Sequence, residues 1–262
     1  FSKGNNKGVA AAKGDYLCIL NPDTVVAEDT FVQLMSYADT IKKPGIIGCQ
    51  LIDGTGQFLP ESKRNVPKPL VALKKLIGLD HLYYANHLEV DAIGQADIFV
   101  GAFMFLKKSV YDAVGGFDED YFMYGEDIDL SYKVLKAGYQ NRYYGKISAV
   151  HFKGESTLRN KEYIKRFYGA MNVFYNKHFK PNVLFKVLVA TGIKIASKKP
   201  QEFKPVNNAV ERTFVTTKEL PIMLKTQLPS PIRVADTIYE SVEDQSMMVY
   251  DVEGLSIKAI IA

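Results

Sequence analysis

The sequence contains no tryptophan and only two cysteines among its 262 residues. Cys18 lies inside a short apolar run, and Cys49 directly follows another. Two cysteines in such positions do not form the spaced pattern of a disulfide framework, so both are expected to be reduced core residues. The shortage of cysteine therefore favours a protein of the cytosol over a small secreted, disulfide-stabilised one.

Long hydrophobic runs and a strong charge of one sign are also missing. The longest apolar stretch, residues 183–195, is interrupted by Lys186 and Lys194, so no segment qualifies as a membrane-spanning helix. The net charge of +4 is too small and too evenly spread to indicate a nucleic-acid partner. The length and the 47% content of hydrophobic residues predict one large globular domain with an appendage.

The stretch of residues 14–24 has the strongest local pattern. Residues 16–20 are a short apolar run, which is typical of a strand buried on both faces. Asn21-Pro22 ends this run because proline has no N–H to continue a ladder. Asp23 then lies just past the carboxyl end of the strand, where open α/β sheets bind ligands. Asp23 either holds a divalent ion shared with substrate phosphates or only caps a turn.

A second group of carboxylates opens a helix predicted for residues 125–136. Glu126, Asp127 and Asp129 follow an aromatic segment, residues 121–124. Acidic residues in a first turn can simply complement the helix dipole. A carboxylate held against apolar side chains has its pKa raised, however, toward that of a useful general base. The cluster therefore predicts an acid–base site in which Asp127 or Glu126 takes the proton.

Helix and strand signals alternate around these two stretches, which predicts an α/β sheet. A helix is expected over residues 29–41, and strands are expected over residues 46–51, 98–106 and 147–150. Gly101, in the middle of one strand, marks a close approach of a ligand or backbone. His151, at the end of the last strand, is either structural or a metal ligand.

The segment of residues 60–69 carries Lys63, Arg64 and Lys68 among three prolines. This composition predicts a mobile surface loop. Its charges are either solvated surface or part of a lid over an anionic substrate.

Five motifs stand in the order and spacing of family 2 glycosyltransferases, over about residues 1–179. They are Asn21-Pro22-Asp23-Thr24, Val100-Gly101-Ala102, the sequence GGFDE at 115–119, the sequence FMYGEDIDL at 122–130, and His151. The chain resembles the rhamnosyltransferase-like branch of that family. The resemblance implies an α/β fold of the GT-A type, with a mostly parallel mixed sheet flanked by helices, and inverting transfer by single displacement.

The resemblance also implies roles for individual residues. Asp127 is the expected base with Glu126 beside it, and Asp23 with His151 is expected to bind Mg²⁺ or Mn²⁺. Residues expected to contact the donor are Asn6, Asn21, Asp23, Gly101 and Ala102; those expected to contact the acceptor are Tyr121, Phe122, Tyr124 and Asp129. The family's first strand, with its acidic residue that binds the uracil or thymine ring, has no counterpart here, so the fold is expected to be incomplete at its N-terminus. Lys133 stands where this branch commonly has arginine.

The implied reaction moves a sugar from dTDP-rhamnose or a UDP-sugar to a hydroxyl of a glycan or lipid-linked saccharide, in the assembly of cell-surface polysaccharide. Two other classes of function compete with it. A nucleotidyltransferase would need a glycine-rich, basic phosphate loop, which the sequence lacks. A non-catalytic module that binds sugar nucleotides or glycans would keep the pocket without needing Asp127.

The character of the chain changes beyond residue 180. The transferase domain is expected over residues 1–180, a basic amphipathic helix and linker over 181–205, and a small α/β appendage over 206–262. Basic residues alternate with aromatic and apolar ones between residues 163 and 199. This pattern favours either the packing of a terminal helix or a peripheral seat on the anionic inner face of the cell membrane.

Overall fold

The computed structural model describes residues 1–69, 71, 81–152, 161–179, 211–215, 232–235, 246–250 and 256–261. The chain divides into two compact units. The first comprises Phe1–Thr24 and Thr30–Gln201, and the second comprises Val25–Asp29 and Glu202–Ala262. The basic segment predicted for residues 181–205 lies outside the described residues.

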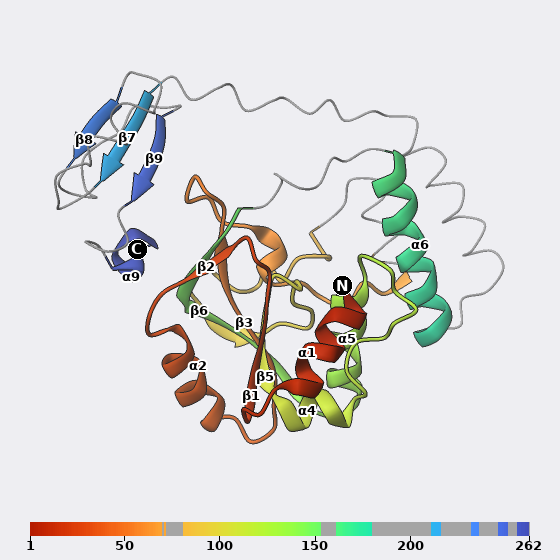
Figure 1. The fold of residues 1–262 in the computed structure, drawn as a ribbon. Coiled ribbons are helices and arrows are strands. Elements are labelled where there is room, and N and C mark those ends of the chain that lie inside the picture. Colours follow the sequence, from red (N-terminus) through yellow and green to blue (C-terminus); the bar gives the residue numbers. More distant parts are fainter. Residues whose placement is uncertain are drawn as a thin grey trace. The chain divides into compact units, whose positions relative to one another are not determined.

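The main sheet has the strand order β1-β5-β3-β6-β2, with β4 paired to β6 (Figure 1). Its strands are β1 (Tyr16–Leu20), β2 (Thr24–Val26), β3 (Pro44–Ile52), β4 (Ile93–Gln95), β5 (Phe103–Lys107) and β6 (Gln140–His151). β5 runs antiparallel to both β1 and β3, while β3 and β6 are parallel. The strands β1, β3 and β6 therefore share one direction, and their carboxyl ends lie at the same edge of the sheet.

Helices cover both faces of this sheet. They are α1 (Ser2–Ala11), α2 (Thr30–Asp39), α4 (Lys108–Ala113) and α5 (Glu126–Lys136), and a further helix, α6 (Lys161–His178), packs against α5. Met104 of β5 packs in one core cluster with residues of α1, α4 and α5. The next residue, Phe105, points to the opposite face, where its ring stacks on Phe31 of α2 at 6.4 Å. The expected α/β architecture of a mixed sheet flanked by helices is thus present (Figure 1).

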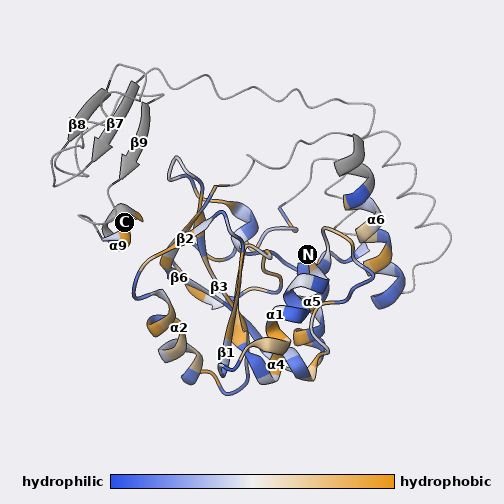
Figure 2. Ribbon diagram, viewed as in Figure 1, coloured by the Kyte–Doolittle hydropathy of each residue, from blue (hydrophilic) through white to orange (hydrophobic). Residues whose placement is uncertain are grey.

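The apolar surface of the sheet is what these helices bury. Figure 2 shows hydrophobic residues along the central strands and largely hydrophilic ribbons for α1 and α5. In α5, Leu130 and Val134 nevertheless lie four residues apart on one face and are buried in the same core cluster as Met104, while Ile128 is buried in a second cluster with residues of α6.

Two local expectations need correction. The strand at residues 16–20 is not buried on both faces: Leu17 and Ile19 are buried, whereas Leu20 is 38% exposed. The strand predicted for residues 98–106 begins only at Phe103, because Phe103 N–H bonds to Val100 O across a turn. Gly101 therefore lies in a turn that precedes the strand, and not inside the strand.

The basic loop of residues 60–69 is also different from its prediction as a solvated or lid-like segment. Lys63 and Arg64 are only 4% and 7% exposed. The backbone of Arg64 exchanges hydrogen bonds with that of Ile98 in an antiparallel bridge. The ammonium group of Lys63 donates to the carbonyl oxygens of Ala85 and Leu88. Only Lys68 of the three basic residues is exposed, so the prediction of a mobile surface loop is wrong for Lys63 and Arg64.

The second unit contains a small parallel sheet with the strand order β8-β7-β9. Its described elements are β7 (Glu211–Val215), β8 (Ile232–Ala235), β9 (Ser246–Tyr250) and α9 (Ile257–Ile261). The carboxylate of Glu28 accepts hydrogen bonds from the N–H groups of Ile257 and Lys258 at the start of α9.

Candidate active site

The carboxyl edge of the sheet brings Asp23 and His151 together. Asp23 follows β1, and His151 is the last residue of β6. Asp23 Oδ1 lies 3.5 Å from His151 Nε2, and the N–H of Phe152 donates to Asp23 O at 3.0 Å. The side chains of Asp23 and His151 are 36% and 8% exposed. Asp23 directly precedes β2, which neighbours β6 in the sheet, and this pairing closes a sequence separation of more than a hundred residues.

These two side chains fit a metal ion that is shared with a substrate. A carboxylate and an imidazole are both common ligands of Mn²⁺, and Asp23 Oδ1 is buried without a hydrogen-bond partner. In the described ranges, no group of three or more His, Cys, Asp or Glu side chains could hold a metal ion. The pair therefore suits a divalent ion whose remaining ligands are phosphate oxygens and water, and it does not form a closed structural site.

The turn at residues 100–102 connects the Asp23 segment to helix α5. The N–H of Asn21 donates to Ala102 O at 3.1 Å, and the N–H of Gly101 donates to Asp127 Oδ2 at 3.3 Å. A Cβ atom at Gly101 would lie 3.6 Å from Cβ of Asp127 and 3.3 Å from the ring of Phe1. The ring of Phe1 is the tighter neighbour, and the spacing to Asp127 is an ordinary van der Waals contact, so the close approach of a ligand or backbone expected at Gly101 stays a prediction.

Asp127 is buried and paired with a cation. Its Oδ2 lies 2.7 Å from Nη2 of Arg64, and the side chains are 12% and 8% exposed. Nη2 of Arg64 also donates to Phe99 O at 2.9 Å. Burial, the largest single effect, lowers the pKa of Arg64, but the charges of Asp127 and Tyr83 and the hydrogen bonds to both together raise it. Sequence analysis missed this contact, because nothing in the loop distinguishes Arg64 from the exposed Lys68.

Glu126 has a different environment from its neighbour. It is 7% exposed, and its Oε2 is buried without a hydrogen-bond partner. Burial, followed by the negative charge of Asp127, raises the pKa of Glu126 to about 7. An apolar setting therefore does raise the pKa of a carboxyl group at the start of α5, as the sequence indicated, and the group is Glu126.

Two residues expected at the acceptor lie inside the protein instead. Tyr121 and Asp129 are 2% and 1% exposed, and the Tyr121 hydroxyl donates to Asp129 Oδ1 at 3.2 Å. Asp129 also lies 2.6 Å from His178 Nε2 and 3.3 Å from Lys133 Nζ. This burial is not compatible with contact to an acceptor. The hydrogen bonds and ion pairs of Asp129 instead connect α6 to α5.

The other two acceptor candidates reach the surface. Phe122 is 75% exposed, and the guanidinium of Arg166 lies 5.5 Å from the centre of its ring. Tyr124 is half-buried, has a positive φ of 70°, and contacts the ring of Phe167 edge-on at 6.4 Å. Phe122 and Tyr124 are therefore the members of the aromatic segment that a sugar ring can reach.

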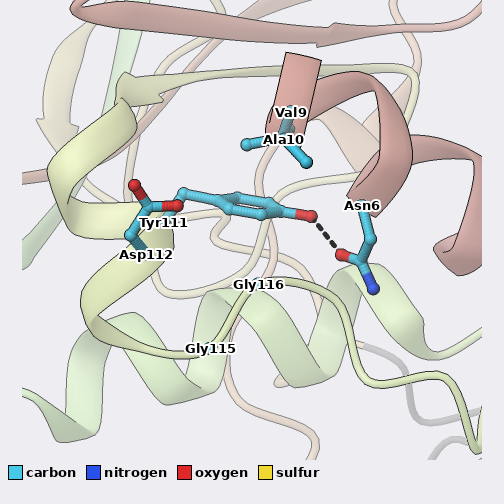
Figure 3. Close-up of a pocket in the computed structure, with 7 residues that line it drawn as sticks. All are labelled: Asn6, Val9, Ala10, Tyr111, Asp112, Gly115 and Gly116. Carbon is cyan, nitrogen blue, oxygen red and sulfur yellow. Dashed lines mark hydrogen bonds between the residues drawn. The ribbon is translucent and has the colours of Figure 1, made fainter. Parts of the chain in front are cut away.

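Asn6, expected at the donor, has all its hydrogen-bonding groups occupied. Its Oδ1 accepts from the Tyr111 hydroxyl at 2.6 Å and from the N–H of Phe117, and its Nδ2 donates to Phe117 O and to Glu119. Figure 3 shows the bond to Tyr111 inside an open cavity of about 230 Å³. The cavity is lined by Asn6, Val9, Ala10, Tyr111, Asp112, Gly115 and Gly116. An amide with two donated and two accepted bonds is saturated, so Asn6 holds the 115–117 turn and leaves no group for a donor.

One protein family has a model that matches residues 1–168: glycosyltransferase like family 2. The chain belongs to that family. Asp23, Gly101, Glu126, Asp127 and His151 of this family 2 protein all lie within the matched residues. The match, with the mixed sheet flanked by helices, confirms the resemblance and the α/β fold class expected from the motifs.

Two curated relatives of this family 2 protein are rhamnosyltransferases. It is 27% identical over 161 residues to rhamnosyltransferase WbbL of Escherichia coli (strain K12), covering 58% of this chain and 60% of that protein. It is 26% identical over 155 residues to an N-acetylglucosaminyl-diphospho-decaprenol L-rhamnosyltransferase of Mycobacterium tuberculosis, covering 56% of this chain and 50% of that protein. The chain thus spans between one half and three fifths of the length of these relatives.

Among solved structures, the mannosyltransferase PcManGT from Pyrobaculum calidifontis, in complex with GDP-Man and Mn²⁺, aligns with a TM-score of 0.43 at 13% identity. The alignment covers 77% of this chain and 56% of that chain. In the part of this family 2 protein that the structure describes, no helix has the length and apolar character needed to cross a membrane.

Proposed function

We propose that the protein is an inverting glycosyltransferase that moves a sugar from a nucleoside-diphosphate sugar to a hydroxyl of a glycan or lipid-linked saccharide. One observation carries the proposal. The Gly101–Ala102 turn joins the segment of Asp23 to the carboxylates of Glu126 and Asp127, inside the residues that match the family.

The donor side of the site is the Asp23 segment. The leaving nucleoside diphosphate gains negative charge as the bond to the sugar breaks. Asp23 and His151 would hold Mg²⁺ or Mn²⁺, which supplies charge neutralisation at that oxygen without a proton. The backbone of Gly101 and Ala102, beside Asn21, would line the path of the sugar between the diphosphate and Asp127.

The acceptor side is the start of α5. The acceptor hydroxyl attacks the anomeric carbon from the face opposite the leaving diphosphate, and a carboxylate takes its proton. Asp127 is the proposed base, since its orientation is held by Arg64 and Gly101. Glu126 is the alternative base, supported by its pKa of about 7 and by its Oε2, which has no hydrogen-bond partner among the described residues. One base is sufficient, because single displacement forms no covalent intermediate.

The substrates are proposed from the relatives. Both are named rhamnosyltransferases, which favours dTDP-rhamnose as the donor, with a UDP-sugar as the alternative. The name of the mycobacterial relative includes a diphospho-decaprenol acceptor, which favours a lipid-linked saccharide here. Such an acceptor would draw the protein to the inner face of the cell membrane as a peripheral protein, in the assembly of cell-surface polysaccharide.

A donor panel tests the proposal. The full-length protein is incubated with dTDP-, UDP- and GDP-sugars and either Mn²⁺ or Mg²⁺, and release of nucleoside diphosphate is measured with and without a polyprenyl-diphosphate saccharide. Release from one donor, accelerated by the acceptor, is expected. Binding without turnover would instead identify a binding module. Turnover of a nucleoside triphosphate with a sugar 1-phosphate would identify a nucleotidyltransferase.

A further inference from the structure

Arg64 is a buried cation that belongs to none of the motifs that carry the family resemblance. Arg64 lies in the segment between β3 and β4 and is 7% exposed. Burying a guanidinium is costly unless it is paired and hydrogen-bonded. The groups that contact the Arg64 guanidinium therefore indicate the role of its charge.

On one side, the Arg64 guanidinium is held by Tyr83 and by residues that precede the Gly101 turn. The Arg64 backbone pairs with Ile98, its Nη2 donates to Phe99 O at 2.9 Å, and its Nη1 lies 3.4 Å from the hydroxyl of Tyr83. Ile98 and Phe99 immediately precede the turn that contains Gly101. The position of the cation is thus coupled to the same turn that contacts Asp127.

On its other side, the guanidinium contacts a single carboxylate among the residues that the structure describes, that of Asp127. Nη2 lies 2.7 Å from Oδ2 of Asp127, the oxygen that also accepts from the N–H of Gly101. The neighbouring Glu126 has a buried oxygen, Oε2, with no hydrogen-bond partner among the described residues. A cation next to one member of a carboxylate pair favours the ionised form of that member and leaves the proton to the other.

The charges around the pair agree with this distribution. The groups that act on it are Arg64 and, through Arg64, the phenol of Tyr83. Burial and the charge of Asp127 raise the pKa of Glu126, while a hydrogen bond to its own backbone and the charge of Arg64 lower it by less. Glu126 thus keeps its proton to about neutral pH, while the carboxylate that Arg64 and the N–H of Gly101 contact is that of Asp127.

We propose that Arg64 is a positioning residue of the transfer reaction, which holds Asp127 ionised and oriented beside Gly101 while Glu126 takes the single proton of the pair. This inference rests on the proposed function, in which Asp127 is the base. In this inference, Arg64 of the basic loop acts on the site through its contact with Asp127, and the loop does not serve as a lid over the substrate.

Three variants of the full-length protein test the activity side. Arg64→Met removes the cation, Arg64→Lys keeps the charge without the planar fork, and Lys63→Met is the control. Lys63 is the adjacent buried cation, and its hydrogen-bond partners in the described part of the chain are the carbonyl oxygens of Ala85 and Leu88. The rate of nucleoside-diphosphate release is measured from pH 4 to 9, with the donor that the panel identifies.

In Arg64→Met the acid limb of the kcat profile is expected to move to higher pH by about one to three units, with little change in donor KM. Arg64→Lys should move it by less, and Lys63→Met should not move it. A profile of Arg64→Met that coincides with the wild type, in protein that melts cooperatively, would overturn the proposal.

A titration that needs no turnover separates this inference from the proposed function. The side-chain carboxyl carbons of Asp and Glu are labelled with ¹³C, and their NMR shifts are followed with pH in the wild type and the three variants. Arg64→Met should move the midpoints of the Glu126–Asp127 pair by at least one pH unit, whereas Lys63→Met should leave them in place. Unmoved midpoints refute the role of Arg64. An inactive wild type with moved midpoints refutes the proposed function alone.

If Arg64→Met does not fold, Arg64→Lys and the double variant Arg64→Met/Asp127→Asn decide the matter. The double variant removes both charges, so it should be more stable than Arg64→Met alone if the pair is coupled. Equal effects of Arg64→Met in the presence and absence of Asp127 would show that the two side chains do not act on each other.

Discussion

The three carboxylates at the carboxyl edge of the sheet lie in different chemical environments. Asp127 accepts hydrogen bonds from the guanidinium of Arg64 and a backbone N–H, and Asp23 lies next to the imidazole of His151. Glu126 has a buried oxygen without a hydrogen-bond partner among the described residues. Similar groups can therefore perform different tasks in one reaction, because each carboxylate has different charged and hydrogen-bonding neighbours.

Asp127 and Glu126 are distinguished by isosteric substitution. Asp127→Asn should lower turnover by about 10²–10⁴-fold, the usual contribution of a positioned base, while donor affinity hardly changes. Glu126→Gln should have a milder effect. Turnover of both variants in the full-length enzyme, at saturating donor, is the measurement. If Glu126→Gln is the more damaging change and Asp127→Asn keeps a near-normal rate, the base is Glu126.

Asp23 is tested by the metal dependence of nucleotide binding. Asp23→Ala should abolish the Mn²⁺- or Mg²⁺-dependent part of the affinity for dTDP or UDP, because it removes the only carboxylate of the Asp23–His151 pair. Isothermal calorimetry with and without the metal measures this. Asp91→Ala, at an exposed pair with Lys146, is the control. Equal metal-dependent affinity in wild type and Asp23→Ala would show that the metal is bound elsewhere or not at all.

At the scale of elements, the first turns of helix α5 have two functions. Glu126 and Asp127 belong to the site, while Asp129 binds Tyr121, Lys133 and His178. The second group includes Tyr121 before α5 and His178 at the end of α6, so it fixes the aromatic segment and both helices to one another. The site therefore depends on α6 although no proposed site residue lies in that helix.

The connection between α5 and α6 predicts a large loss of stability on its removal. Asp129→Ala leaves buried partners uncompensated and should lower the free energy of unfolding by about 3–5 kcal/mol. Urea denaturation measures the effect. The control Asp112→Ala, at the exposed pair with Lys108, should stay within about 0.5 kcal/mol of wild type. A small effect of Asp129→Ala would mean that apolar packing alone holds α6.

At the scale of the whole molecule, all proposed site residues belong to the first of the two compact units. Its stability should depend on pH through Glu126. The pKa of this group is about 7 in the folded protein against an ordinary value of 4.5, so the folded state binds more protons between these values. Folding stability from this group is present below pH 4.5 and is lost as the pH rises toward 7.

The variant Glu126→Gln makes this loss measurable. Relative to wild type it should gain about 2–3 kcal/mol in free energy of unfolding between pH 4.5 and pH 7.5, because glutamine cannot ionise. Denaturation curves of both proteins across this range provide the comparison. Parallel pH profiles of the two proteins would contradict the raised pKa.

Much of the fold was predictable from sequence, because local chemistry specifies it. An apolar run followed by proline predicted β1 and the position of Asp23 at its end. Helical spacing between the acidic start and Gly138 predicted α5 almost to its observed bounds, Glu126–Lys136. The order of the motifs predicted the family, and the candidates Asp23, His151, Gly101 and Asp127 followed from it.

The tertiary structure alone decided which polar groups are buried and with which partners. Arg64 and Asp127 are 63 positions apart, and Asn6 and Phe117 are 111 apart, so no local pattern connects them. Arg64 and Lys68 have similar charges in one loop, yet only Arg64 lies where the packed sheet presents a carboxylate. Residue type sets what a side chain can do, but burial and partners depend on which surfaces meet when the chain folds. Tyr121, Asp129 and Asn6 became structural residues for that reason.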